Sequence, residues 1–137
     1  MDSERVFATE PMPRVLIIDD NALNKKLLTT ILNGRGFEIE SADSAESGRE
    51  ILNTSRIDIV LMDVRMPGMD GLELTRLLRV EPTHRSLIIV AITANAMSTD
   101  RDAAIAAGCD AYVSKPIETA SLVPLLVGLL ASRSIER

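Results

Sequence analysis

The sequence predicts a single α/β domain in which helices cover both faces of a central parallel sheet. Five apolar segments with strand character alternate with five segments whose apolar residues recur every three or four positions. Strands that alternate with helices pair in parallel through right-handed crossovers. Three of the strands are apolar without alternation, which is typical of burial on both faces. The 137 residues are enough for one domain with its own core.

The first strand and helix are expected immediately after the N-terminal segment. Residues 14–18 form a buried strand, and the helix that follows ends at the glycines of segment 33–36. Residues 37–42 are more alternating, which suggests a strand at an edge of the sheet. Asp43 or Ser44 can cap the next helix.

A proline and two glycines between Met66 and Gly71 end the third strand in tight turns. The same patterns predict every later element. In order, these are strand 57–62, helix 71–80, strand 87–92, a helix from Ser98 to Gly108, strand 110–113 and a leucine-rich helix over 122–130. We therefore expect a domain over residues 13–132, a flexible lead-in over 1–12 and a polar tail over 133–137.

Composition excludes several classes of partner. The formal net charge is −5 and the pI is about 4.9, with no basic stripe, which argues against direct binding to nucleic acid or to an anionic membrane. No segment is long enough to span a bilayer, and the N-terminus does not resemble a signal peptide. The single cysteine, Cys109, cannot form an intramolecular disulfide. We expect a cytoplasmic protein.

Polar side chains follow four of the five predicted strands. Asp19 and Asp20 follow the first strand, Asp63 the third, Thr93 the fourth and Lys115 the fifth. The carboxyl ends of parallel strands share one edge of the sheet, where ligands bind. These five side chains are therefore expected to lie close together.

Three neighbouring carboxylates repel one another, and at least one pKa rises unless a cation neutralises them. Oxygen ligands with room for water suit Mg²⁺. Separately, Asp19 and Asp20 could form a solvated helix N-terminus, and Asp63 could simply start a turn. Lys115 has the charge and reach to contact a carboxylate or a phosphate, and Pro116 is a candidate for a cis peptide bond.

Other enzymatic motifs are missing from the sequence. It contains no G-x-S-x-G elbow, no P-loop, and no G-x-G-x-x-G after the first strand. The single histidine, His84, is expected to be a solvated loop residue. Nucleotide-cofactor and serine-hydrolase functions therefore have little support.

Four ordered motifs resemble the receiver domain of two-component response regulators over residues 14–131. They are VLIIDDN, LMDVRMPGMDG, ITA and SKP. The residues in and around these motifs are most similar to single-domain regulators of the DivK type and to the receivers of hybrid histidine kinases. The resemblance implies a CheY-like, flavodoxin-like (βα)5 fold in three layers, with strand order 2-1-3-4-5.

The resemblance also implies a role for each residue at the strand ends. Asp63 would accept a phosphoryl group from a phosphohistidine of a histidine kinase or a histidine phosphotransfer protein. The implied roles are Asp19, Asp20, Asp63 and the backbone carbonyl of Arg65 for Mg²⁺, Thr93 and Lys115 for the phosphoryl oxygens, and Thr93 and Tyr112 for the switch. Such a domain catalyses only its own phosphorylation and dephosphorylation, and it is otherwise not an enzyme. Arg65 and Asn95 occupy positions that influence hydrolysis.

The leading functional hypothesis is a single-domain response regulator that signals to a downstream protein target through contacts dependent on phosphorylation. An alternative is an intermediate receiver of a longer relay or of a hybrid kinase. An aspartate-nucleophile phosphatase is disfavoured because its second acid would stand where Arg65 does. A flavin-binding protein is disfavoured by the scarcity of aromatic residues and by the acidic strand ends.

Overall fold

A computed structural model describes residues 12–94 and 98–136 of the chain. Most of the expected lead-in, residue 137 and Asn95 lie outside these residues. The described elements are β1 (Arg14–Ile18), α2 (Ala22–Leu32), β2 (Glu38–Ala42), α3 (Ala45–Thr54), β3 (Ile59–Asp63), α4 (Gly71–Arg79), a 3₁₀ turn η1 (Pro82–His84), β4 (Ile88–Thr93), α5 (Ser98–Ala107), β5 (Ala111–Ser114) and α6 (Thr119–Glu136). Within them, no helix combines the length and apolar character that a membrane crossing requires.

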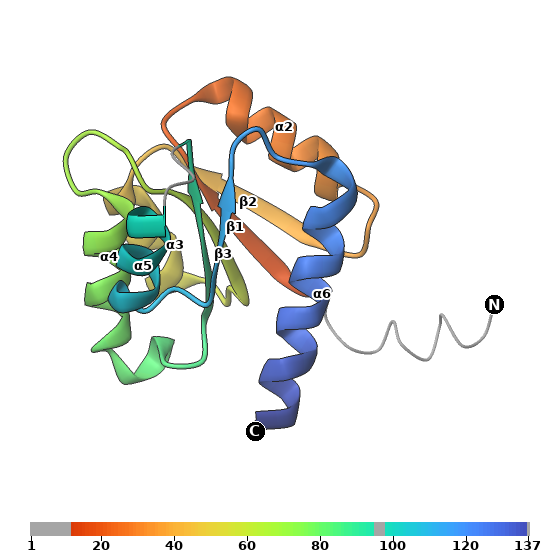
Figure 1. The fold of residues 1–137 in the computed structure, drawn as a ribbon. Coiled ribbons are helices and arrows are strands. Elements are labelled where there is room, and N and C mark those ends of the chain that lie inside the picture. Colours follow the sequence, from red (N-terminus) through yellow and green to blue (C-terminus); the bar gives the residue numbers. More distant parts are fainter. Residues whose placement is uncertain (1–11, 95–97, 137) are drawn as a thin grey trace.

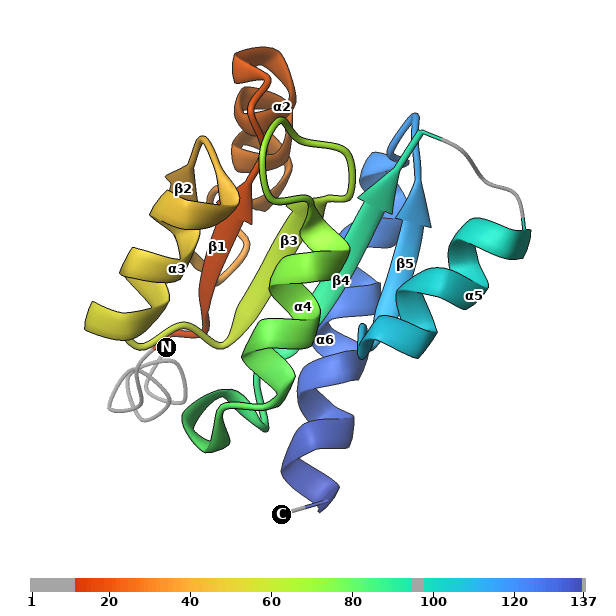
Figure 2. The ribbon, with the colours of Figure 1, turned by 90° about the vertical axis from the view of Figure 1, so that its left-hand side faces the viewer.

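The five strands form one parallel sheet in the order β2-β1-β3-β4-β5, which confirms the expected fold (Figure 2). The apolar segments expected to be buried on both faces became β1, β3 and β4, and every residue of β3 and β4 is buried. The more alternating β2 lies at an edge and is partly exposed. Continuous apolar sequence therefore corresponds to interior strands, and alternating sequence corresponds to an edge strand.

Helices lie on both sides of the sheet (Figure 1), and the sheet separates two apolar cores. Val60 and Met62 of β3 join the core beneath α3, α4 and α5, while Ile59 and Leu61 join the core beneath α2 and α6. Successive side chains of a strand point to opposite faces, so one apolar strand supplies both cores. This gives three layers, with the carboxyl ends of all five strands at the same edge.

Polar caps begin the helices beside that edge. Asn21 accepts a hydrogen bond from the backbone N–H of Asn24, which starts α2. Ser44 rather than Asp43 caps α3, and its hydroxyl accepts from the backbone N–H of Ser47. Each cap satisfies a backbone donor that the first turn of a helix leaves free.

At the opposite edge, where the strands begin, Arg79 fastens the end of α4 to its neighbours. Its guanidinium donates to the carbonyls of Gly108 and Leu87, at 2.8 and 2.7 Å, and to the carboxylate of Asp110 at 2.8 Å. The same Asp110 carboxylate accepts from the backbone N–H of Ile89 at 2.8 Å. One arginine thus joins α4, α5, β4 and β5.

Asp58, just before β3, gathers three donors at the same edge. Its carboxylate accepts from the backbone N–H of Arg14 at 2.9 Å, from Arg133 at 3.2 Å and from Arg56 at 2.5 Å. Burial alone would raise the pKa of Asp58, but these hydrogen bonds outweigh it and hold the pKa below its ordinary value. Because Arg133 belongs to α6, the helix continues past residue 132, where the polar tail was expected to begin, and is fixed to the sheet there.

Replacing Asp58 by asparagine is expected to lower the free energy of unfolding by about 2–3 kcal/mol at neutral pH, since each hydrogen bond to a charged group contributes about 1.5–3 kcal/mol. The lowered pKa means that the stabilisation is present above the pKa of the unfolded chain and disappears as the pH falls through the folded pKa. Urea unfolding at neutral and acidic pH measures both effects. Asp102→Asn is the control, because Asp102 is exposed and forms no ion pair with another described residue; an equal loss in both variants would contradict the assignment.

The expectation for His84 was wrong. The residue lies at the end of η1 and is only 9 % exposed. Its Nε2 is 3.5 Å from Oε1 of Glu81, and its carbonyl accepts a hydrogen bond from Arg79 at 3.2 Å. The loop looks polar in sequence, but these contacts pack its histidine inward.

Candidate functional site

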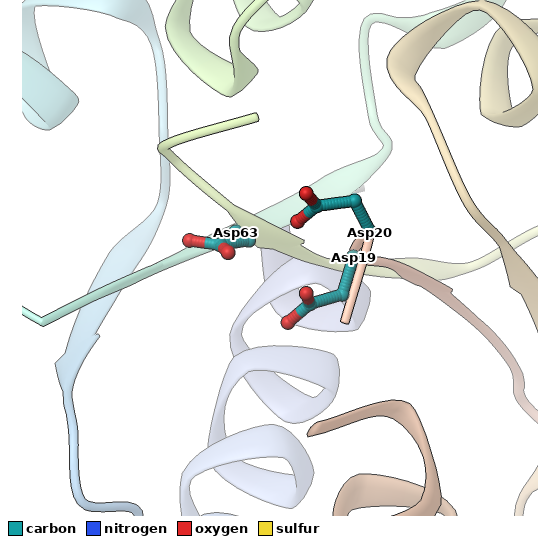
Figure 3. Close-up of side chains that lie close together, drawn as sticks. All are labelled: Asp19, Asp20 and Asp63. Atoms are coloured by element: carbon teal, nitrogen blue, oxygen red, sulfur yellow. The ribbon is translucent and has the colours of Figure 1, made fainter. Parts of the chain in front are cut away.

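Three carboxylates meet at the carboxyl ends of β1 and β3 (Figure 3). Asp19 and Asp20 follow the last residue of β1, and Asp63 is the last residue of β3. One oxygen from each of the three lies within 4.8 Å of the others. The close approach follows from the pairing of β1 with β3, which puts Ile18 opposite Met62 and both strand ends at one level.

Asp63 is a buried carboxylate with a cation beside it. The residue is 7 % exposed, and its Oδ2 lies 3.5 Å from Nζ of Lys115. Its Oδ1 accepts a hydrogen bond from the backbone N–H of Arg65 at 3.3 Å. One oxygen is therefore turned to the following loop and the other to the end of β5.

The pKa of Asp63 is raised above its ordinary value. Burial is the largest cause, and the neighbouring charge of Asp19 adds to it. The Lys115 ammonium and the Arg65 backbone N–H favour the ionised form but do not offset these two effects. A further cation close to Asp63 would therefore favour the ionised form of its carboxyl group.

The raised pKa predicts that Asp63→Asn stabilises the unphosphorylated domain when divalent cations are removed by a chelator. Ionised Asp63 costs folding free energy above its folded pKa, and the cost disappears as the pH falls through that pKa towards the unfolded value. The melting temperature of the variant should therefore exceed that of the wild type at neutral pH and approach it in acid. A gain that is the same at every pH would contradict this explanation.

The other two carboxylates differ in exposure. Asp19 is 1 % exposed, and its Oδ1 accepts from the backbone N–H of Asn21 at 2.9 Å. Its own backbone N–H donates to the carbonyl of Ala42 at 3.1 Å, which fixes the end of β1 against β2. Asp20 is exposed. The cluster thus has a fixed inner wall and an open side towards solvent.

The loop after β3 folds back closely on Asp63. The backbone N–H of Gly71 donates to the carbonyl of Val64 at 3.0 Å. A Cβ at Gly71 would lie 2.8 Å from the backbone carbonyl oxygen of Asp63 and 3.0 Å from Cε of Met62, so only glycine fits. Asp70 caps α4 and accepts from the backbone N–H of Glu73 at 2.9 Å. The start of α4 is therefore packed directly against the end of β3.

Lys115 is positioned by the end of β4. Its backbone N–H donates to the carbonyl of Thr93 at 2.8 Å, and the Lys115–Pro116 peptide bond is cis. Thr93 is 3 % exposed and lies on the strand that pairs with β3, one residue beyond the partner of Asp63. The structure thus brings all five predicted side chains to one edge of the sheet, with Asp19, Asp20, Asp63 and Lys115 closest together.

A cavity of about 30 Å³ lies beside this edge and is lined by Thr93, Arg65, Tyr112 and Asp100, among others. Tyr112 is partly buried and packs against the core beneath α3, α4 and α5. The sequence motifs indicate the first three of these residues but not Asp100. Its position in the first turn of α5 was the only available signal, and a first-turn acid usually serves the helix dipole.

The residues present fit a hard divalent cation. Three carboxylate oxygens within 4.8 Å supply oxygen ligands and negative charge, and the exposed side at Asp20 leaves room for water. Burial and the charge of Asp19 raise the pKa of Asp63, so a bound cation would favour its ionised form. Among the residues that the structure describes, no nitrogen or sulfur ligand joins the cluster, which disfavours a zinc-type site.

The chain belongs to the response regulator receiver domain family, whose model matches residues 15–126. Two kinds of curated relative share the domain. The response regulator DivK of Brucella anthropi is 32 % identical over 120 residues, which cover 87 % of this chain and 98 % of that protein. The sensor histidine kinase GacS of Pseudomonas protegens is 37 % identical over 118 residues, which cover 84 % of this chain but only 13 % of the kinase.

Solved structures agree with this assignment. A putative response regulator from Chloroflexus aurantiacus has a TM-score of 0.84 at 31 % identity, covering 89 % of this chain and 99 % of that one. The receiver domain of sensor histidine kinase PA1611 from Pseudomonas aeruginosa has a TM-score of 0.80 at 29 % identity, covering 88 % and 98 %. That structure carries a magnesium ion coordinated in the active site cleft. The present chain is thus a receiver domain of two-component signalling.

Proposed function

We propose that this domain accepts a phosphoryl group on Asp63 from a partner phosphohistidine and signals through contacts that change with phosphorylation. The buried position of Asp63 between two carboxylates and one ammonium carries the proposal. A nucleophile held beside a fixed cation is what phosphoryl transfer requires, because positioning and electrostatics supply most of its catalysis. The same surroundings do not suit a nucleotide cofactor or a flavin.

In the proposed reaction, an oxygen of Asp63 bonds to phosphorus as the bond from phosphorus to the histidine nitrogen breaks, and the histidine keeps that electron pair. Lys115 lies 3.5 Å from one Asp63 oxygen and contacts the phosphoryl oxygens after transfer. Thr93, at the neighbouring strand end, donates its hydroxyl to the same group. Tyr112 lines the cavity beside Thr93 and follows its movement.

Asp19, Asp20, Asp63 and the backbone carbonyl of Arg65 would hold Mg²⁺. When bound, the ion supplies positive charge against the acidic cluster and the phosphoryl oxygens. Asp20 provides the exposed ligand, while Asp19 is fixed by Asn21. The partners would be a histidine kinase or a histidine phosphotransfer protein and a downstream protein target, within the cytoplasm.

Incubation with acetyl phosphate tests the proposal most directly. The wild type should gain one phosphate by intact-mass measurement when Mg²⁺ is present and none when it is chelated. The label should map to the peptide that contains Asp63 and be lost in hydroxylamine, which cleaves acyl phosphates. A wild type that gains no phosphate in Mg²⁺, or gains it equally without Mg²⁺, would overturn the proposal.

A second candidate is an intermediate receiver in a longer relay or in a hybrid kinase. The 37 % identity to a part of GacS favours it, since that relative is a sensor histidine kinase. The two candidates differ in where the phosphoryl group goes next. Radiolabel that passes from Asp63 to a histidine phosphotransfer protein supports the relay, whereas label that is lost only to water supports the single-domain regulator.

A further inference from the structure

A groove of about 520 Å³ lies at the edge of the sheet where the strands begin, at the opposite end from Asp63. One wall is the segment that leads into β4, residues 85–88, and the other is the last part of α6, with Leu129, Ser132 and Arg133. Sites for small molecules have volumes of about 300–1,000 Å³. The groove is therefore large enough for a small organic ligand.

The α6 wall lies beyond the residues that the receiver family model matches. That match ends at residue 126, whereas α6 continues to Glu136. Arg133 holds the added turns of the helix against the sheet, because its guanidinium donates to the carbonyl of Asp58 at 3.3 Å and to the carboxylate of Asp58 at 3.2 Å. The groove thus depends on the extended last helix and is separate from the site around Asp63.

Arginines outnumber aspartates around this groove, although the formal net charge of the chain is −5. Each carboxylate in the set is paired with at least one arginine. The charged residues of the lining and the residues that pair with them are Arg56, Arg79, Arg85, Arg133, Asp58 and Asp110. The set keeps a net charge of +2, which favours an anionic ligand.

Arg85 and Arg133 are the cations that line the groove itself. Arg85 is exposed and forms no ion pair with any described residue. Arg133 uses three N–H groups, two for Asp58 and one for the carbonyl of Ser86 at 3.5 Å. A guanidinium has five, so two have no partner among the described residues. Its planar fork matches the oxygens of a phosphate group.

We propose that this groove binds a small organic phosphate monoester. Such a group carries about −1.5 to −2 charges at pH 7, close to the excess positive charge around the groove. Arg85 and Arg133 hold the phosphoryl oxygens, and the exposed hydroxyl of Ser132 donates to them. Leu129 is only partly buried and contacts the apolar body of the ligand. The ester is bound unchanged, and binding does not depend on phosphorylation of Asp63.

The test is the binding of phenyl phosphate to the full chain, followed by amide NMR shifts with a chelator present. Shifts are expected at residues 85–88 and 129–133, and not around Asp63. Arg85→Ala should weaken binding about tenfold or more, because it removes a charge-assisted hydrogen bond. Arg35→Ala is the matched control, since Arg35 is an exposed arginine that does not line the groove, and it should bind like the wild type.

Ser132→Asp tests the α6 wall without removing a contact that holds the helix. Ser132 is exposed, so the new carboxylate should leave the fold intact and repel the phosphate. Ala131→Asp is the matched control, because the neighbouring Ala131 is exposed and does not line the groove; it should lose much less affinity. Inorganic phosphate should bind more weakly than phenyl phosphate, since only the ester contacts Leu129.

Four results would each overturn the inference. They are shifts centred on Asp63, wild-type binding by Arg85→Ala or by Ser132→Asp, equal binding of inorganic phosphate and phenyl phosphate, and tighter binding of a phosphoserine peptide, which would assign the groove to a protein partner. None of these results bears on phosphate incorporation at Asp63, so the groove and the proposed function are tested separately.

Discussion

Replacing Asp63 by asparagine is expected to abolish phosphate incorporation from acetyl phosphate. The asparagine side chain has nearly the same size and can still accept the Arg65 backbone hydrogen bond that Asp63 accepts at 3.3 Å. It lacks the anionic oxygen that would bond to phosphorus. Since the substitution also removes a charge that burial disfavours, the fold should be retained. Intact mass and peptide mapping measure the loss.

Comparison of Asp20→Asn with Asp63→Asn distinguishes the role of metal ligand from the role of nucleophile. Asp20 belongs to the acidic cluster but is exposed and is not the proposed nucleophile. This variant should incorporate phosphate slowly at limiting Mg²⁺ and recover as Mg²⁺ is raised, whereas Asp63→Asn should not recover at any concentration. Persistent labelling of Asp63→Asn at another residue would contradict the assignment of the phosphoacceptor.

Replacing Lys115 by methionine should slow phosphate incorporation about 100-fold or more, because removing one preorganised group that stabilises developing charge costs about 10²–10³ in rate. Methionine preserves the length and apolar stem of the side chain. Lys115 is the one cation within ion-pair distance of Asp63 among the described residues. The rate is measured as the initial increase of phosphorylated protein at saturating Mg²⁺.

The loss should follow from charge at this position. Lys26→Met, on the exposed face of α2, is the matched control and should leave the rate unchanged. Lys115→Arg should retain part of the rate, since it keeps the charge but differs in shape. The Lys115 ammonium also lowers the pKa of Asp63, so Lys115→Met should raise that pKa further. Equal rates in Lys115→Met and wild type would remove Lys115 from the site.

Most of the fold could be predicted from local patterns. Continuous apolar runs gave the buried strands β1, β3 and β4, and the alternating segment gave the edge strand β2. The order of the strands came from the resemblance to receiver domains instead. Periodicity identifies strands and helices, but it does not determine on which side of its predecessor each new strand is added.

The site was predictable where it depends on strand ends and unpredictable where it depends on packing. The shared edge of a parallel sheet was enough to place Asp63 near Lys115. The burial of His84 and of the Asp100 oxygen depends on contacts with segments distant in sequence, such as the hydrogen bond from Arg79 to the His84 carbonyl. Single-sequence patterns do not contain such contacts.

Opposite ends of the strands perform opposite electrostatic tasks. Where the strands begin, the charges are matched, with Asp58 held by arginines and Asp110 held by Arg79. Where they end, like charges are crowded around Asp63. The repulsion between carboxylates at the site thus lies a full strand length from the ion pairs that stabilise the fold. Substitutions where the strands begin can therefore raise the free energy of unfolding without changing the charges around Asp63, so stability and signalling can evolve separately.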